Sequence, residues 1–198
     1  MTTTESLQAQ WLEGVRLLKA GKHEQAFYKF KAITDQDPNC APALAGIANV
    51  YYETYQPRKA WDAAQRAAEL LPRHTFTLGL ALQCALRLGK FDDAKRYATK
   101  AYKLAPKAAD GIKAYLLYLS SIGDVSKVER LARELLALDK STEARLTAGT
   151  ALETAGRIPE AIRIYRNAIA DVVAANSPPP PYQRGQSSMN VLKTHSLI

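Results

Sequence analysis

The side chains that most often catalyse reactions or bind metals are few and scattered in this chain. Its three histidines, His23, His74 and His195, have no second histidine or cysteine at the spacing of metal ligands. The sequence contains no glycine-rich phosphate-binding loop and no Gly-x-Ser-x-Gly nucleophile motif. The sequence therefore predicts no metal, no cofactor and no catalytic site, and so a protein that is not an enzyme.

Two other features could be mistaken for reactive groups. Asp92 and Asp93 could form an acid–base pair, but we interpret them as acids in the first turn of a helix, where they complement its dipole. Cys84 lies among apolar neighbours, so we expect a buried, inert thiol. Because Cys40 and Cys84 form no Cys-x-x-Cys pair, we expect both to be reduced, as in a cytoplasmic protein.

Composition places the chain among ordinary globular proteins. Of its 198 residues, 47% are hydrophobic and 23% are charged, which excludes collagen, a disulfide scaffold and wholesale disorder. No stretch is long and apolar enough to span a membrane, and the N-terminus does not resemble a secretory signal, so we expect a cytoplasmic protein. The net charge of +8 favours acidic partners.

Three residue types recur with a period of 34 residues. The recurring positions are Pro38, Pro72 and Pro106; Ala26, Ala60 and Ala94; and Gly21, Gly89 and Gly123. Tyr55 stands where the glycine series lacks a member, and Gly156 follows Gly123 after 33 residues. The chain is therefore an array of similar units.

Each unit reads as two helices. Apolar residues recur at helical spacing on both sides of the glycine, which suits the left-handed position that closes the first helix. The proline then ends the second helix. We call the two helices A and B. Small residues at their crossing allow close approach, and stacking of neighbouring units supplies a core that one pair cannot form alone.

This pattern resembles the tetratricopeptide repeat (TPR) family. The third unit carries it most clearly, with Gly89-Lys90-Phe91-Asp92-Asp93-Ala94, Ala98 and Pro106. The resemblance implies an all-α solenoid, a right-handed superhelix of antiparallel helix pairs over residues 7–175. The five repeats are expected at about 7–40, 41–74, 75–108, 109–141 and 142–175.

Several positions depart from the family pattern. Tyr55 replaces the turn glycine, and we expect Gln56-Pro57 to reshape that turn. Leu82 and Leu116 stand where a small residue is typical, so we expect helices A and B of repeats three and four to be further apart.

The two ends differ from the array. We expect residues 1–6 to be frayed and the Pro-rich tail, residues 176–198, to be disordered. Pro179–Tyr182 matches the Pro-Pro-x-Tyr form that WW domains read, although a linker is the better interpretation. The apolar residues 189–198 could instead occupy a groove of the array.

The family resemblance also implies where a partner binds, because helix A of each repeat lines the concave face and holds extended peptides or helices there. The residues expected to face this groove are Gln8, Trp11, Val15, Lys19, Asn49, Tyr52, Glu53, Phe76, Gln83, Arg87, Lys113, Leu117, Ser120, Leu146, Thr150 and Glu153. The alternative for Trp11, Tyr52 and Phe76 is that they pack against neighbouring helices.

One TPR subtype is excluded by its residues. Co-chaperones of heat-shock proteins hold a carboxylate with a clamp of Lys, Asn and Arg. The corresponding positions here carry Trp11, Val15, Gly46, Phe76 and Leu80.

Three functions stay open. The first is a non-catalytic, chaperone-like scaffold that holds a partner peptide in the groove. The second is the N-terminal interaction domain of a larger enzyme, such as a TPR-linked glycosyl- or sulfotransferase. The third is a basic array that binds an acidic partner or nucleic acid through Lys95, Arg96, Lys100, Lys103 and Lys107, most of which lie on helix B of repeat three. No recognised module favours nucleic acid.

Overall fold

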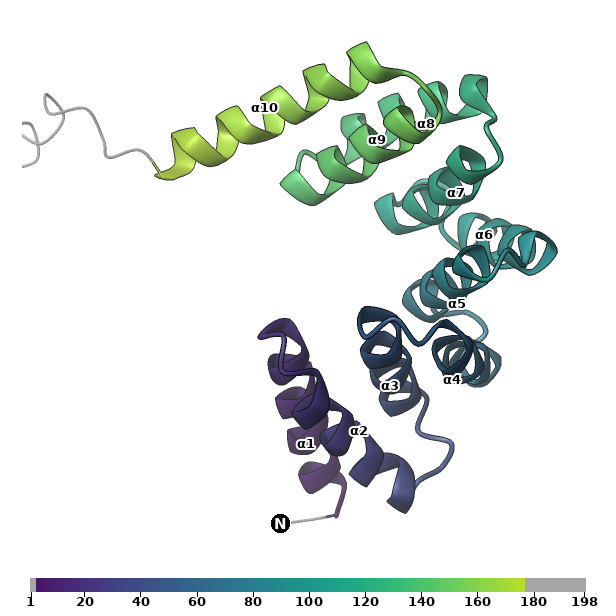
Figure 1. Cartoon of the computed structure of the whole chain (residues 1–198), viewed down its shortest axis with the longest axis vertical. Coiled ribbons are helices and arrows are strands. Elements are labelled where there is room, and N and C mark those ends of the chain that lie inside the picture. The colour runs from purple at the N-terminus through teal and green to yellow at the C-terminus, as the bar shows by residue number, and fades with distance from the viewer. Residues whose placement is uncertain (1–2, 177–198) are drawn as a thin grey trace, which may run out of the picture.

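The structure, a computed structural model of the chain, describes residues 3–176 (Figure 1). All regular secondary structure in this range is helical. The helices are α1 (Thr3–Lys19), α2 (His23–Gln36), α3 (Ala41–Glu53), α4 (Pro57–Leu70), α5 (Thr75–Arg87), α6 (Phe91–Leu104), α7 (Ala109–Ser121), α8 (Val125–Leu138), α9 (Thr142–Thr154) and α10 (Ile158–Asn176).

Successive helices form the five predicted A–B pairs, from α1–α2 to α9–α10. Helix α1 begins at Thr3, within the stretch 1–6 that we expected to fray, and α10 continues to Asn176. The predictions for residues 177–198, including the Pro-Pro-x-Tyr sequence and a tail in the groove, lie outside the described residues.

The A helices form an inner row and the B helices an outer row. Helices α1, α3, α5 and α7 each contact the next A helix along the chain, whereas the B helices contact only A helices among the residues described. A stack whose A helices touch and whose B helices do not must curve towards the A side. The result is the crescent of Figure 1, with the A helices on its concave face.

The A–B turns share one geometry. Gly21, Gly89, Gly123 and Gly156 have φ between 68° and 80°, and the next residue donates a backbone hydrogen bond five residues back, as in Lys90 N to Ala85 O at 2.9 Å.

Tyr55 keeps this turn geometry. Its φ is 58°, and Gln56 N donates to Tyr51 O at 2.9 Å. The expectation that Gln56-Pro57 reshapes the turn was therefore wrong. The reason is that a Cβ at the equivalent glycines, such as Gly89, meets nothing within 4 Å, so a side chain fits there. Only the left-handed backbone is unfavourable for tyrosine, at about 1 kcal/mol.

The repeats are joined by tight packing between a B-helix side chain and two A helices. Phe30 of α2 is fully buried, and a Cβ added to either Gly14 of α1 or Gly46 of α3 would lie 2.7 Å from its ring. The ring therefore fits only because both facing positions are glycines. In the last repeat, Gly149 of α9 faces Tyr165 of α10 in the same way.

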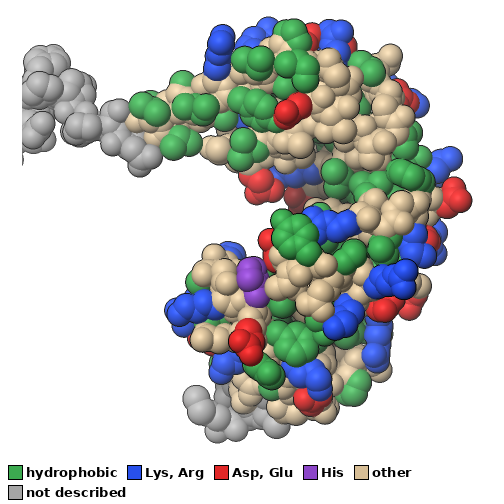
Figure 2. Space-filling view, in the orientation of Figure 1, with side chains coloured by type: hydrophobic (Ala, Val, Ile, Leu, Met, Phe, Trp, Pro, Cys, Tyr) green, Lys and Arg blue, Asp and Glu red, His purple; other side chains and the backbone are tan. Residues whose placement is uncertain are grey.

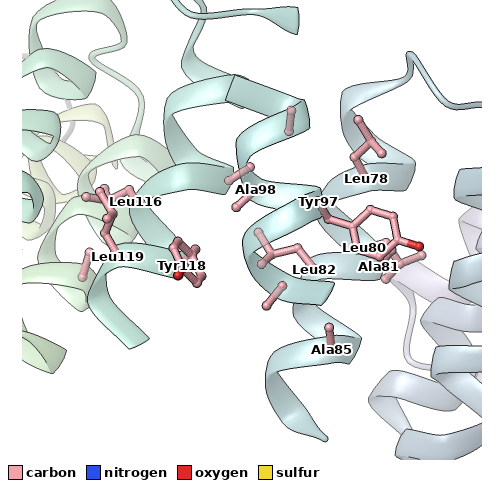
Figure 3. Packing of buried hydrophobic residues seen from close by; sticks show 14 of the residues in the cluster. Leu78, Leu80, Ala81, Leu82, Ala85, Tyr97, Ala98, Leu116, Tyr118 and Leu119 are labelled. Carbon is pink, nitrogen blue, oxygen red and sulfur yellow. The ribbon is translucent and has the colours of Figure 1, made fainter. Parts of the chain in front are cut away.

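In repeats three and four, the large and small residues exchange helices. In repeats one and five, a glycine on the A helix is followed 16 residues later by a large ring on the B helix, Phe30 or Tyr165. In repeats three and four, the same two positions carry a fully buried leucine on the A helix, Leu82 or Leu116, and an alanine on the B helix, Ala98 or Ala132. We expected the leucines to separate the paired helices, but alanines on the B helices offset their volume. Figure 3 shows Leu82, Ala98 and Leu116 in one buried cluster contributed by α5, α6 and α7.

We predict that Gly46→Ala destabilises the fold. The added methyl group overpacks the Phe30 ring, at a cost of about 1–3 kcal/mol that exceeds the gain of roughly 1 kcal/mol in helix propensity. Gly79→Ala is the matched control, because Gly79 also lies inside an A helix but its Cβ would meet open space. Thermal unfolding followed by circular dichroism should show a lower melting temperature for Gly46→Ala and a higher one for Gly79→Ala. Equal shifts of the same sign would contradict this packing.

Candidate functional site: a groove on the concave face

A groove of about 640 Å³ crosses four A helices, α3, α5, α7 and α9. Because these helices run parallel on the inner row, side chains one turn apart along each helix face the same hollow. Figure 2 shows the concave side of the crescent as a deep indentation between the N-terminal and C-terminal helices. The indentation is bordered by hydrophobic, acidic and basic side chains.

The groove is largely apolar. Leu80 and Leu82 of α5 are buried below it, and Leu117 of α7 is half-buried. Phe76 and Leu146 stand on its borders with 55% and 50% of their surface exposed. Exposed large apolar side chains beside an apolar floor are typical of a surface that binds a partner.

The charges of the groove are arranged around Lys113. Its Nζ lies 2.9 Å from Glu143 Oε1 and 3.6 Å from Asp139 Oδ2. Burial acts to lower the pKa of Lys113, but the hydrogen bond to Glu143 and the charges of Glu143, Asp139 and Asp110 outweigh it, so the pKa is raised. Lys113 is therefore a fixed cation whose charge is already balanced by acids.

About half of the residues predicted from the sequence line this groove. They are Asn49, Phe76, Gln83, Lys113, Leu117, Ser120, Leu146 and Thr150. Those that do not line it are Gln8, Trp11, Val15, Lys19, Tyr52, Glu53, Arg87 and Glu153. For these eight, a place on the partner-binding face stays a prediction.

For α1, the alternative interpretation was the better one. Trp11 and Val15 are half-buried and pack against the cluster of Leu17, Phe30 and Ile47. They therefore contribute to the junction of the first two repeats.

The residues that the sequence reasoning missed lie one turn from those it found. They include Thr75 and Gly79 on α5, Asp110 and Ser121 on α7, and Glu143, Thr147 and Thr154 on α9. Most of them lie three or four residues from Gln83, Lys113 or Thr150, because residues at that spacing share one face of a helix.

The predicted basic residues lie on the outer row. Lys95, Arg96, Lys100 and Lys103 are exposed on α6, and Lys107 is exposed in the following loop. Arg96 forms an ion pair of 2.7 Å with Asp93, which leaves Asp93 engaged in a local helical pair. Four of these five residues lie on a single helix, and within residues 3–176 no side chain from a second helix lines the hollow beside them.

The other candidate groups lie apart from one another. Within residues 3–176, no three side chains of His, Cys, Asp or Glu gather as a metal site, and no helix there is long and apolar enough to cross a membrane. Cys84 is fully buried and Cys40 half-buried, and neither forms a disulfide. Burial raises the pKa of the Cys84 thiol to about 11, against the opposing effect of the Arg87 charge.

Comparison with known protein families identifies the family of this chain. The family described as the N-terminal TPR repeats region of Psidin matches residues 2–111, more than half of the chain. The chain belongs to this TPR family. A comparison with curated protein sequences found no match. TPR arrays in general are protein-interaction scaffolds, and this chain has that fold.

Solved structures agree on the fold along most of the chain. A thermophilic TPR protein of Thermus thermophilus superposes with a TM-score of 0.74 at 20% identity, covering 83% of this chain and 90% of its own. A TPR protein of Parabacteroides merdae gives 0.67 at 15% identity, with 87% and 66% covered. The pilF protein of Pseudomonas aeruginosa gives 0.66 at 18% identity, with 89% and 79% covered. At these identities the likeness concerns the fold alone.

We predict that the two thiols differ in reactivity. At pH 8, Ellman's reagent should modify one thiol per folded chain and two after unfolding in guanidinium, because the thiolate is the reactive form and Cys84 is both buried and protonated. Cys40→Ser should abolish the reaction of the folded chain. Rapid modification of Cys84 in folded Cys40→Ser would contradict the buried position assigned to it.

Proposed function

We propose that this chain is a non-catalytic, chaperone-like adaptor that holds an extended segment of a protein partner in the groove across α3, α5, α7 and α9. The observation that carries the proposal is the groove itself, whose apolar floor and exposed Phe76 and Leu146 are left uncovered by the rest of the described chain.

The composition of the groove suits an extended chain. Asn49 and Gln83 present side-chain amides that can hydrogen-bond a peptide backbone, while Phe76, Leu117 and Leu146 offer contacts for apolar side chains. Because the lining residues are held on packed helices, the groove is largely preformed and little ordering is needed on binding.

The two other functions have less support. The basic patch on α6 is charged, but the hollow beside it is lined by one helix only. Such a surface suits electrostatic steering of an acidic partner more than tight binding of a segment. A role as the N-terminal part of a larger enzyme is compatible with the same groove, since the array would then recruit substrates or partners for another domain. The cytoplasmic location also stays a prediction.

We predict that Phe76→Ala/Leu146→Ala weakens binding of groove-selected peptides by tenfold or more. Truncation of an apolar anchor residue costs at least about 1 kcal/mol, so the two truncations together exceed the roughly 1.4 kcal/mol that corresponds to a factor of ten in affinity. The measurement is fluorescence anisotropy with peptides selected on the full-length chain from a random phage-displayed library.

Phe91→Ala/Leu138→Ala is the matched control. It removes the same two side-chain types, each 52% exposed, from the B helices outside the groove. This control should retain full affinity and both variants should retain wild-type helicity. If the control loses binding while the groove variant keeps it, the groove is not the site.

A further inference from the structure

Tyr55 is a strained residue that the packing of this chain does not explain. Its backbone is left-handed at the position where four other turns use glycine. Its side chain is 82% exposed, so the fold gains little from the ring. An exposed aromatic residue held in a strained conformation is a common mark of a functional site.

The ring of Tyr55 belongs to a cluster built around Arg87. The Arg87 guanidinium lies 3.8 Å from the centroid of the Tyr52 ring and 5.4 Å from that of Tyr55. Arg87 Nη1 also donates a hydrogen bond of 2.8 Å to the Tyr52 carbonyl oxygen. Two cation–π contacts and a hydrogen bond thus hold this exposed guanidinium in place.

No carboxylate among the described residues forms an ion pair with Arg87. The guanidinium retains further N–H donors, whose planar fork matches a carboxylate. The surrounding segments 51–59 and 86–90 contain four cations, Arg58, Lys59, Arg87 and Lys90, against one acid, Glu53. The cluster is therefore a positive site that lacks an anionic partner.

The cluster lies at one end of the groove. Tyr52 follows Asn49 on α3, and Arg87 follows Gln83 on α5, each by about one helical turn. The acids Asp110 and Glu143 stand at the start of α7 and α9, which is the opposite end of these parallel helices, about 18 Å away along the axes. The groove thus has a positive end and a negative end, because at the second end the three acids Asp110, Asp139 and Glu143 outnumber the one cation Lys113.

We propose that Tyr52, Tyr55 and Arg87 anchor an Asp or Glu side chain of the protein segment that lies in the groove. This inference rests on the proposed function and adds the chemistry of the partner. Residues 177–198 of this chain contain no Asp or Glu, so they do not supply this anchor, and a segment of a partner protein is the occupant that we propose.

The geometry also gives the spacing of charges in the segment. A path from Arg87 to Glu143 covers about 18 Å along the helix axes and two helix spacings of roughly 8–10 Å, or about 25 Å in all. An extended chain spans that distance in about eight residues. The partner segment therefore carries an acid, then apolar residues, then a Lys or Arg about eight positions from the acid.

A random dodecapeptide library displayed on phage and selected on the full-length chain tests this pattern. The peptides that the wild-type chain selects should share an Asp or Glu at a fixed position relative to their apolar residues. Selection on Arg87→Gln should lose the acid and keep the apolar preference. Arg130→Gln, a change at an exposed arginine of α8, is the matched control and should select the same peptides as the wild type.

A double-mutant cycle tests whether Arg87 contacts the acid of the peptide directly. With a synthetic peptide from the selection, Arg87→Gln should weaken binding at least tenfold, and replacing the peptide's acid by its amide should do the same. The two changes together should cost no more than either alone. Tyr55→Gly should raise the melting temperature by about 2–4 °C and yet weaken binding, because it relieves strain and removes a ring from the cluster.

Two failures are distinguishable. If selected peptides depend on Phe76 and Leu146 but lack the acid, or if the two changes act additively, the anchoring site is wrong and the groove stands. If the wild-type chain selects no peptide that Phe76→Ala/Leu146→Ala weakens, the groove proposal fails and the anchoring site fails with it.

Discussion

The structure depends on close approach between an A helix and the B helix that it crosses. Gly14 of repeat one and Gly46 of repeat two leave the space that the Phe30 ring fills, and in repeat five Gly149 does so for Tyr165. Since one helix pair cannot bury its apolar surface alone, each such contact also depends on the next repeat. In repeats three and four, the large side chain is on the A helix instead, as Leu82 or Leu116, so the crossing of the two helices is filled without a glycine.

This packing also produces the concave face. The A helices touch their successors along the inner row, while the B helices diverge on the outside, so the crescent curves towards the A side. The groove therefore takes its floor from the core, because Leu80 and Leu82 contribute to both. A site supported in this way needs little ordering when a partner binds, whereas the Lys-rich surface of α6 is supported by one helix only.

Sequence reasoning predicted the array because its signals are local and periodic. The 34-residue spacing of prolines, alanines and glycines predicts where the turns lie. The left-handed backbone of the A–B turn is present even where Tyr55 replaces the glycine. The groove was predicted in part. Trp11 and Val15 do not line the groove, because they pack against the cluster that joins the first two repeats. The Lys113–Glu143 pair joins α7 to α9 across repeats, and no periodicity in one repeat reveals such a contact.

Site-specific photo-crosslinking tests the central claim, that partners bind on the inner row, most directly. Benzoylphenylalanine would be introduced in place of Leu146 in the groove or in place of Leu138 on α8, two leucines with 50% and 52% of their surface exposed. Irradiation in native lysate, followed by mass spectrometry of the adducts, should give a partner peptide crosslinked at position 146 and none at position 138. The same partner crosslinked at position 138 alone would contradict the account and place the binding surface on the outer row.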